Sequence, residues 1–216
     1  MAMQSEVLLS VMAVAWSTLL QCSRPFRKRE LVRRVIAALI LFAVPGVQLR
    51  SSGDMANMGL NFSNPGITLL SVLLFSGLAV AVNKYTEPDT RVYPQLRKAQ
   101  WTPPLFIING TTWILYLVAY ELLFRGYLFF SCLEHYPLWL ASTINVIIYS
   151  LSHLPKGIKE TLLCIPFGLL LCMLTWYTGN IWSAVFIHIA LALSNDYYAV
   201  AATKREKQPH YAFRSK

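Results

Sequence analysis

Glu121 and Arg125 lie four residues apart in the otherwise apolar stretch YELLFRGYLFF, which runs from Tyr120 to Phe130. Residues at i and i+4 share one face of a helix, so this carboxylate and guanidinium can pair. In hydrocarbon such a pair costs less than two isolated charges, but a well-packed apolar pair is often as stable. Stability therefore does not account for the two residues, and the alternatives are a catalytic role and a structural ion pair between helices.

Two histidines occur in later apolar stretches, His153 in IIYSLSHLP and His188 in IWSAVFIHIA. A lone histidine on an apolar helix is usually a hydrogen-bonded core residue. Two imidazoles on separate helices, with the Glu121 carboxylate on a third helix, instead indicate a convergent polar site.

One carboxylate and two imidazoles support two chemistries. A buried carboxylate beside a cation can deprotonate water, while the imidazoles orient the water or stabilise an oxyanion. The same three side chains can bind zinc and leave a fourth position for water. The sequence has no HExxH motif and the three residues come from separate helices, so zinc ranks second and we expect no metal or other cofactor.

The composition indicates the elements that must position these residues. Hydrophobic residues make up 56% of the 216-residue chain and charged residues 13%, whereas a soluble domain has about 25% charged residues. We therefore expect an all-α fold, a polytopic transmembrane helical bundle that forms one integral membrane domain over residues 1–216. A spanning helix needs roughly 20 mostly apolar residues. The sequence contains about seven such spans, at 6–22, 31–49, 67–83, 105–131, 138–153, 161–177 and 181–201.

The basic residues are distributed between the spans. The connectors 23–34, 84–104 and 154–160, together with the tail from residue 202, hold 17 of the 19 Lys and Arg residues. Seven spans place these four segments on one side, which the positive-inside rule makes cytoplasmic. The N-terminus is then outside and the C-terminus cytoplasmic. This pattern predicts contact with membrane lipid and argues against a nucleic-acid partner.

Three motifs in order resemble those of the CPBP family, the CAAX proteases and bacteriocin-processing enzymes also called Abi proteins. The family motif EExxxR, often continued as RGYL, stands here as YELLFRGYL. The motif FxxxH stands as YSLSH at 149–153, followed by LP, and HxxxN stands as HIALA at 188–192. The likeness covers residues 103–195, which we expect to be the motif-bearing core.

The resemblance implies an intramembrane endopeptidase of the glutamic type. In the family, the first Glu of EExxxR activates water, the second Glu and the Arg support it, and the His and Asn residues position the water and stabilise the oxyanion. Carried over to matching positions, the resemblance gives four candidate catalytic residues: Glu121, Arg125, His153 and His188. It also implies a peptide or lipidated protein substrate, and we expect the protein in the bacterial cytoplasmic membrane.

Two positions depart from the family pattern. Tyr120 replaces the first Glu, and a tyrosine with a pKa of about 10 is a poor base at neutral pH. Ala192 replaces the Asn, and loss of one oxyanion donor costs about 10²–10³ in rate. Glu121 is the remaining candidate for the base, and Asn195 for the amide. The alternative to a protease is therefore a catalytically impaired relative that acts as a membrane binding or accessory protein.

A proton-coupled transporter is the third hypothesis, because buried charges also mark ion paths. The sequence shows neither paired broken helices nor two matching halves, so we rank it below the other two.

Overall fold

The computed structural model describes residues 2–23, 29–52, 55–86, 89–98 and 100–206, and within these ranges the chain is helical with no strand. The longer helices are α1 (Ala2–Cys22), α3 (Glu30–Ser52), α4 (Pro65–Thr86), α5 (Pro103–Glu121), α6 (Phe130–His135), α7 (Leu138–Leu151), α8 (Ile158–Thr178) and α9 (Trp182–Glu206). Short helical turns cover Ala56–Met58 (η1), Leu122–Phe129 (η2) and Leu154–Lys156 (η3). The all-α class is confirmed, and each expected span contains a helix, although α7 ends at Leu151, two residues before the end of the expected span 138–153.

Several of these helices are long and apolar enough to cross a membrane. Within the described residues they are Ser5–Cys22, Pro65–Thr86, Pro103–His135, Ile158–Thr178 and Trp182–Lys204, and Leu138–Leu151 is a shorter apolar helix. The protein is therefore an integral membrane protein. The count of seven crossings stays a prediction, because five helices meet these criteria of length and composition.

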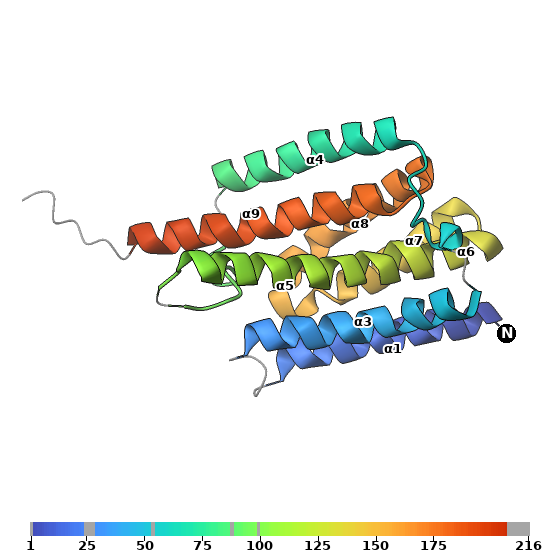
Figure 1. Ribbon diagram of the computed structural model, residues 1–216, viewed down its shortest axis with the longest axis horizontal. Helices are drawn as coiled ribbons and strands as arrows, with labels where there is room; N and C mark the ends of the chain where they lie inside the picture. The colour runs from blue at the N-terminus through green and yellow to red at the C-terminus, as the bar shows by residue number, and fades with distance from the viewer. Residues whose placement is uncertain (1, 24–28, 53–54, 87–88, 99, 207–216) are drawn as a thin grey trace, which may run out of the picture.

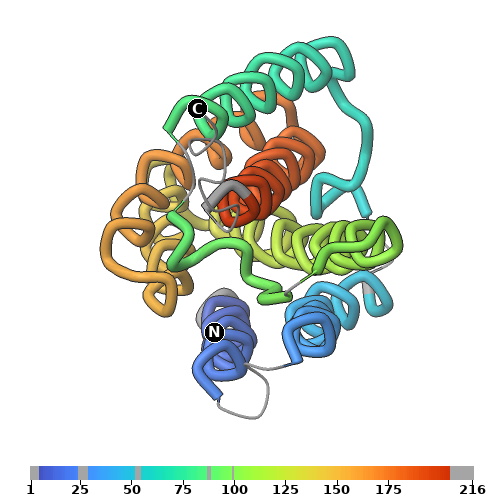
Figure 2. Tube along the Cα trace, turned by 90° about the vertical axis from the view of Figure 1, so that its left-hand side faces the viewer, coloured from blue at the N-terminus to red at the C-terminus, as the bar shows by residue number. Residues whose placement is uncertain are grey.

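The two helices that carry most of the site lie in the middle of the bundle. α9 packs against α4, α5 and α8, and α5 also packs against α3. Seen along the helices, α1 and α3 lie on one side of α5 and α9, and α4 lies on the opposite side (Figure 2). The main hydrophobic core surrounds η2, the segment that follows α5, and buried residues of α1, α3, α7 and α8 pack around it.

The basic connectors lie together at one end of the bundle, where α1 and α4 end and α3 and α5 begin (Figure 1). The loop before α5 is fixed there by two hydrogen bonds. Tyr93 Oη donates to Glu160 Oε1 at 2.8 Å, and the Gln95 backbone N–H donates to Asp196 Oδ1 at 2.9 Å. Residues 24–28 and 207–216, which carry part of the basic charge, lie outside the described residues. The assignment of this end to the cytoplasm stays a prediction.

The fourth expected span differs in one respect from a regular α-helix. After α5 ends at Glu121, the next eight residues form a π-helical segment, η2, and the chain returns to α-helix at Phe130. Asn145 on α7 donates to the backbone oxygen of Phe124 at 2.6 Å. Helices often depart from regular α-helical geometry where a side chain hydrogen-bonds to a main-chain group of the helix. π-Helical turns are frequent at functional sites. Arg125 lies inside this segment.

The contact between α7 and α8 depends on a glycine. A methyl group at Gly168 would lie 2.9 Å from Tyr149 Cδ1, whereas a methyl group at Gly77 on α4 would meet nothing within 4 Å. We expect Gly168→Ala to lower the free energy of unfolding by about 1–3 kcal/mol, because a packed core resists added volume. Gly77→Ala, the matched control, should be neutral or stabilising by up to about 1 kcal/mol.

Unfolding in mixed detergent and SDS micelles, followed by tryptophan fluorescence, measures both changes. Equal stability of the two glycine variants would contradict close packing at Gly168.

Candidate functional site

The Glu121 carboxylate is the centre of the site. It is 0% exposed, and its Oε1 lies 2.5 Å from His188 Nδ1 on α9. Its Oε2 lies 3.0 Å from Arg125 Nη1, one turn further along the chain. Because a carboxylate only accepts, Nδ1 of His188 carries a proton and donates it to this contact, which leaves Nε2 as the other ring nitrogen.

Arg125 holds the carboxylate from the side opposite His188. It is 0% exposed, and its Nη2 donates to the backbone oxygen of Gly168 on α8 at 3.3 Å. The guanidinium carbon lies 4.4 Å from the centre of the Tyr149 ring, within the range of a cation–π contact. The Oε2–Nη1 contact is an ion pair without hydrogen-bond alignment. Charge pairing and ring contact therefore hold Arg125 between α5, α7 and α8.

His153 begins the turn that follows α7. Its Nδ1 lies 3.0 Å from the backbone oxygen of Tyr149, which only accepts, so Nδ1 is again the protonated nitrogen. His153 also lines the cavity, and Nε2 is the ring nitrogen left for a group bound there.

The Tyr120 ring packs edge-on against both imidazoles. Its centre is 6.2 Å from that of His153 and 5.7 Å from that of His188. Its hydroxyl lies 2.6 Å from Ser152 Oγ, and Ser152 in turn donates to the backbone oxygen of Tyr149 at 2.7 Å. Tyr120 is therefore the donor to Ser152. In place of a carboxylate, this position supplies an aromatic wall and a hydroxyl that is already hydrogen-bonded.

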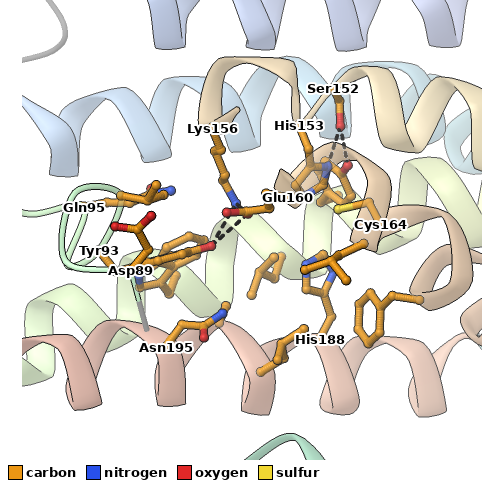
Figure 3. A pocket seen from close by; sticks show the side chains of 18 of the residues that line it. Asp89, Tyr93, Gln95, Ser152, His153, Lys156, Glu160, Cys164, His188 and Asn195 are labelled. Atoms are coloured by element: carbon orange, nitrogen blue, oxygen red, sulfur yellow. Dashed lines mark hydrogen bonds and ion pairs between the residues drawn. The ribbon is translucent and has the colours of Figure 1, made fainter. Parts of the chain in front are cut away.

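A cavity of about 350 Å³ joins these groups to the basic end of the bundle (Figure 3). Tyr120, His153, His188 and Ala192 line it, whereas Glu121 and Arg125 do not. The half-buried Asn195 also lines it, one turn beyond Ala192. The loop before α5, η3 and the start of α8 line its other end, with Asp89, Tyr93, Gln95, Lys156, Lys159 and Glu160.

The four residues predicted from the sequence divide into two that line the cavity, His153 and His188, and two that lie behind its wall, Glu121 and Arg125. Glu121, Arg125 and His188 are in direct contact, and His153 lines the same cavity as His188. Of these four residues, only the two histidines line the cavity, so the Glu121 carboxylate can act on a bound group only through His188. Among the described residues, no group of three or more His, Cys, Asp and Glu side chains is arranged to hold a metal ion.

A second buried polar cluster was missed in the sequence. Arg34 on α3 donates from Nη1 to Asn109 Oδ1 at 2.7 Å, and Asn109 donates to Asp196 Oδ2 at 2.8 Å. Trp113 Nε1 also donates to Asp196, at 3.1 Å. The sequence did contain one indication of this cluster, because Asp196 is an acidic residue inside the last expected span. The basic pair at 33–34 had the usual appearance of residues at a helix end.

Comparison with known families supports the motif assignment. Residues 99–194 match the family model described as type II CAAX prenyl endopeptidase Rce1-like. Neither a curated protein nor a solved structure matches the chain. The matched segment contains Glu121, Arg125, His153 and His188, which the resemblance had selected.

The buried ion pair can be tested by removing one or both charges. Glu121→Gln leaves Arg125 charged and without a counterion, so we expect the free energy of unfolding to fall by about 3–5 kcal/mol. The double variant Glu121→Leu with Arg125→Met should recover most of this loss, because an apolar pair replaces the ion pair. The same micelle unfolding assay measures both. A double variant as unstable as Glu121→Gln would show that the pair is not the main source of the effect.

Proposed function

We propose that this protein hydrolyses a peptide bond of a substrate, and that the reaction takes place in the cavity beside His153 and His188. Residues 99–194 belong to the CAAX-protease family of intramembrane endopeptidases, which supports this proposal. The observation that best supports this proposal is the carboxylate–imidazole contact from Glu121 to His188 at the wall of the cavity. A buried carboxylate behind an imidazole fixes its tautomer and stabilises the imidazolium ion that forms when Nε2 takes a proton.

In this proposal, His188 is the general base. Its Nε2 takes one proton from a water molecule, and His153 Nε2 accepts a hydrogen bond from the second O–H of that water. The water oxygen attacks the peptide carbonyl carbon. When the tetrahedral intermediate collapses, the C–N bond breaks and His188 returns the proton to the leaving amine. Glu121 acts through His188, and Arg125 compensates the charge of Glu121.

The oxyanion needs a donor that Ala192 does not supply. Asn195 lies one helical turn further on, lines the same cavity and is half-buried. It follows His188 by seven residues, about 10 Å along α9, so its amide lies at the other end of the cavity from the reacting carbonyl (Figure 3). We therefore assign no side chain to the oxyanion, and water in the cavity is the donor that this proposal leaves for it.

The site determines how the substrate enters. The cavity extends to the basic end of the bundle, which we place in the cytoplasm by the positive-inside rule. The substrate is accordingly a peptide or lipidated protein that reaches the bacterial cytoplasmic membrane from the cytoplasm, with membrane lipid around the helices.

A catalytically impaired relative is the second candidate function. The aromatic side chain of Tyr120 occupies the place of the family's first Glu, and Ala192 leaves the third motif without an amide. A protein with this cavity and no turnover would hold a peptide and act as a binding or accessory subunit.

Replacement of the proposed base tests the first candidate. We expect His188→Gln to lower kcat on a fluorescence-quenched peptide by about 10²–10⁴, the usual contribution of a general base. His135→Gln is the matched control, because His135 is exposed at the end of α6. Turnover of His188→Gln equal to that of the control would rule out the assignment.

Restoring the family pattern separates the two candidates. If the protein is a protease as it stands, Tyr120→Glu with Ala192→Asn should change kcat by less than about tenfold, because the base is already in place. If it is an impaired relative, turnover should appear only in the double variant, with a gain of about 10²–10³ from the oxyanion donor alone. Initial rates on the same peptide measure this difference.

A further inference from the structure

The Tyr120 hydroxyl belongs to a short chain of hydrogen bonds at the inner end of the cavity. Its Oη lies 2.6 Å from Ser152 Oγ, and Ser152 Oγ lies 2.7 Å from the backbone oxygen of Tyr149. His153 Nδ1 lies 3.0 Å from the same backbone oxygen. The positions of these atoms do not fix a single arrangement of the hydroxyl protons, because a hydroxyl group rotates to suit its partners.

Two arrangements of the protons fit the same positions of the atoms. In the first, Tyr120 donates to Ser152, and Ser152 donates to the Tyr149 oxygen. In the second, Ser152 turns its proton toward Tyr120 Oη, while His153 Nδ1 still donates to the Tyr149 oxygen. The second arrangement frees the O–H of Tyr120 for a group in the cavity. It gives up one hydrogen bond, and an acceptor in the cavity restores that bond.

The Tyr120 hydroxyl lies at the end of the cavity that holds both histidines. The cavity is lined by Tyr120, Ser152, His153 and His188, and the last three lie at the same end of it (Figure 3). Ser152 Oγ, the partner of the hydroxyl, is 3.2 Å from His153 Nδ1. The Tyr120 ring is in edge-on contact with both imidazoles. A group bound against the two imidazoles is therefore a neighbour of the Tyr120 side chain.

Hydrolysis at this place requires a donor for the oxyanion. The attacked carbonyl oxygen gains a negative charge, and the methyl group of Ala192 offers it no polar hydrogen. A tyrosine hydroxyl is a neutral donor, whereas an ionised carboxylate at the same position only accepts and would repel the charge. The residue at position 120 therefore has the chemistry that Ala192 lacks.

We propose that the Tyr120 hydroxyl donates a hydrogen bond to the oxyanion of the tetrahedral intermediate, and that Ser152 releases it by turning its own proton toward Tyr120 Oη. Tyr120 keeps its proton, so the proton of the attacking water still passes to His188 and then to the leaving amine. The oxyanion thus has a donor in the protein and does not depend on cavity water alone. This inference rests on the proposed hydrolysis, to which it adds a catalytic residue.

Removal of this one hydroxyl tests the proposal. Tyr120→Phe keeps the ring that packs against both imidazoles, and we expect kcat on the fluorescence-quenched peptide to fall by about 10²–10³. KM should change by less than about threefold, because the bond forms only as the charge develops. Tyr177→Phe is the matched control, since it removes a hydroxyl from a side chain on α8 that is 62% exposed. Equal turnover of the two variants would overturn the proposal.

Ser152→Ala separates donation to the oxyanion from a structural role. The bond between Tyr120 and Ser152 joins α5 to the end of α7, and a purely structural role predicts equal losses of kcat in Tyr120→Phe and Ser152→Ala. The proposal predicts a loss of less than about tenfold in Ser152→Ala, because the Tyr120 hydroxyl remains and needs no release. Equal losses in both variants would overturn the role of Tyr120 as the donor.

Equilibrium binding of a transition-state analogue tests the same donor without turnover. The probe is a dansyl-labelled apolar hexapeptide with a phosphinate in place of its central peptide group, bound to the full-length protein in neutral detergent. Its reference is the same peptide with an uncharged ketomethylene group there. We expect the phosphinate to bind at least about 10² more tightly than the reference. Tyr120→Phe should reduce this preference by about 10–10².

The outcomes distinguish this inference from the proposed function. A phosphinate preference that needs the Tyr120 hydroxyl, in a protein without peptidase activity, would support the donor and count only against hydrolysis. Peptidase activity that needs His188 but not the Tyr120 hydroxyl would overturn the donor and leave the proposed function in place. If Tyr120→Phe does not fold, Ser152→Ala decides, because loss of its phosphinate preference would overturn the release of Tyr120 by Ser152.

Discussion

The structure depends on one buried carboxylate. Glu121 is completely enclosed, and its two oxygens face an imidazole from α9 and a guanidinium from the π-helical segment after α5. A carboxylate in so apolar a place persists only with a counterion and hydrogen bonds. Those partners couple α5, α8 and α9 around one point and fix which nitrogen of His188 is protonated. The orientation of the His188 imidazole is therefore a consequence of how this charge is buried.

The cavity has two ends with different chemistry. At the inner end, the two imidazoles and the Tyr120 ring surround the place where we propose that a peptide bond is hydrolysed. At the outer end, guanidinium, ammonium and carboxylate groups crowd together, with one donor of Arg34 left unsatisfied. The departures at Tyr120 and Ala192 both lie on the wall of this cavity.

Local sequence patterns were enough to predict the elements and the ion pair. Long apolar runs gave the helices, since lipid requires roughly 20 such residues per span, and i, i+4 spacing gave the contact between Glu121 and Arg125. The motifs also selected His188. What these local patterns could not predict is the direction in which the Glu121 carboxylate points. Whether Glu121 faces the cavity or the back of an imidazole depends on how α9 packs against α5, and that packing is not encoded in the spacing of one helix.

The remaining features arise from contacts between distant segments. The π-helical turn is accompanied by a bond from Asn145, twenty-one residues away from Phe124 in the chain. The cluster of Arg34, Asn109 and Asp196 joins three helices, and each residue alone resembles an ordinary helix-end or core position. Tyr120 was recognised as a departure from the family pattern, but its hydrogen bond to Ser152 follows from the way α7 ends beside α5.

Nitrogen NMR of the protein labelled with ¹⁵N-histidine tests the central claim most directly. We expect His188 to show a protonated, strongly hydrogen-bonded Nδ1 and an unprotonated Nε2 at neutral pH, and we expect the Nδ1 signal to move when Glu121 is replaced by Gln. A proton on Nε2, or a His188 spectrum that is the same with and without the Glu121 carboxylate, would contradict the account.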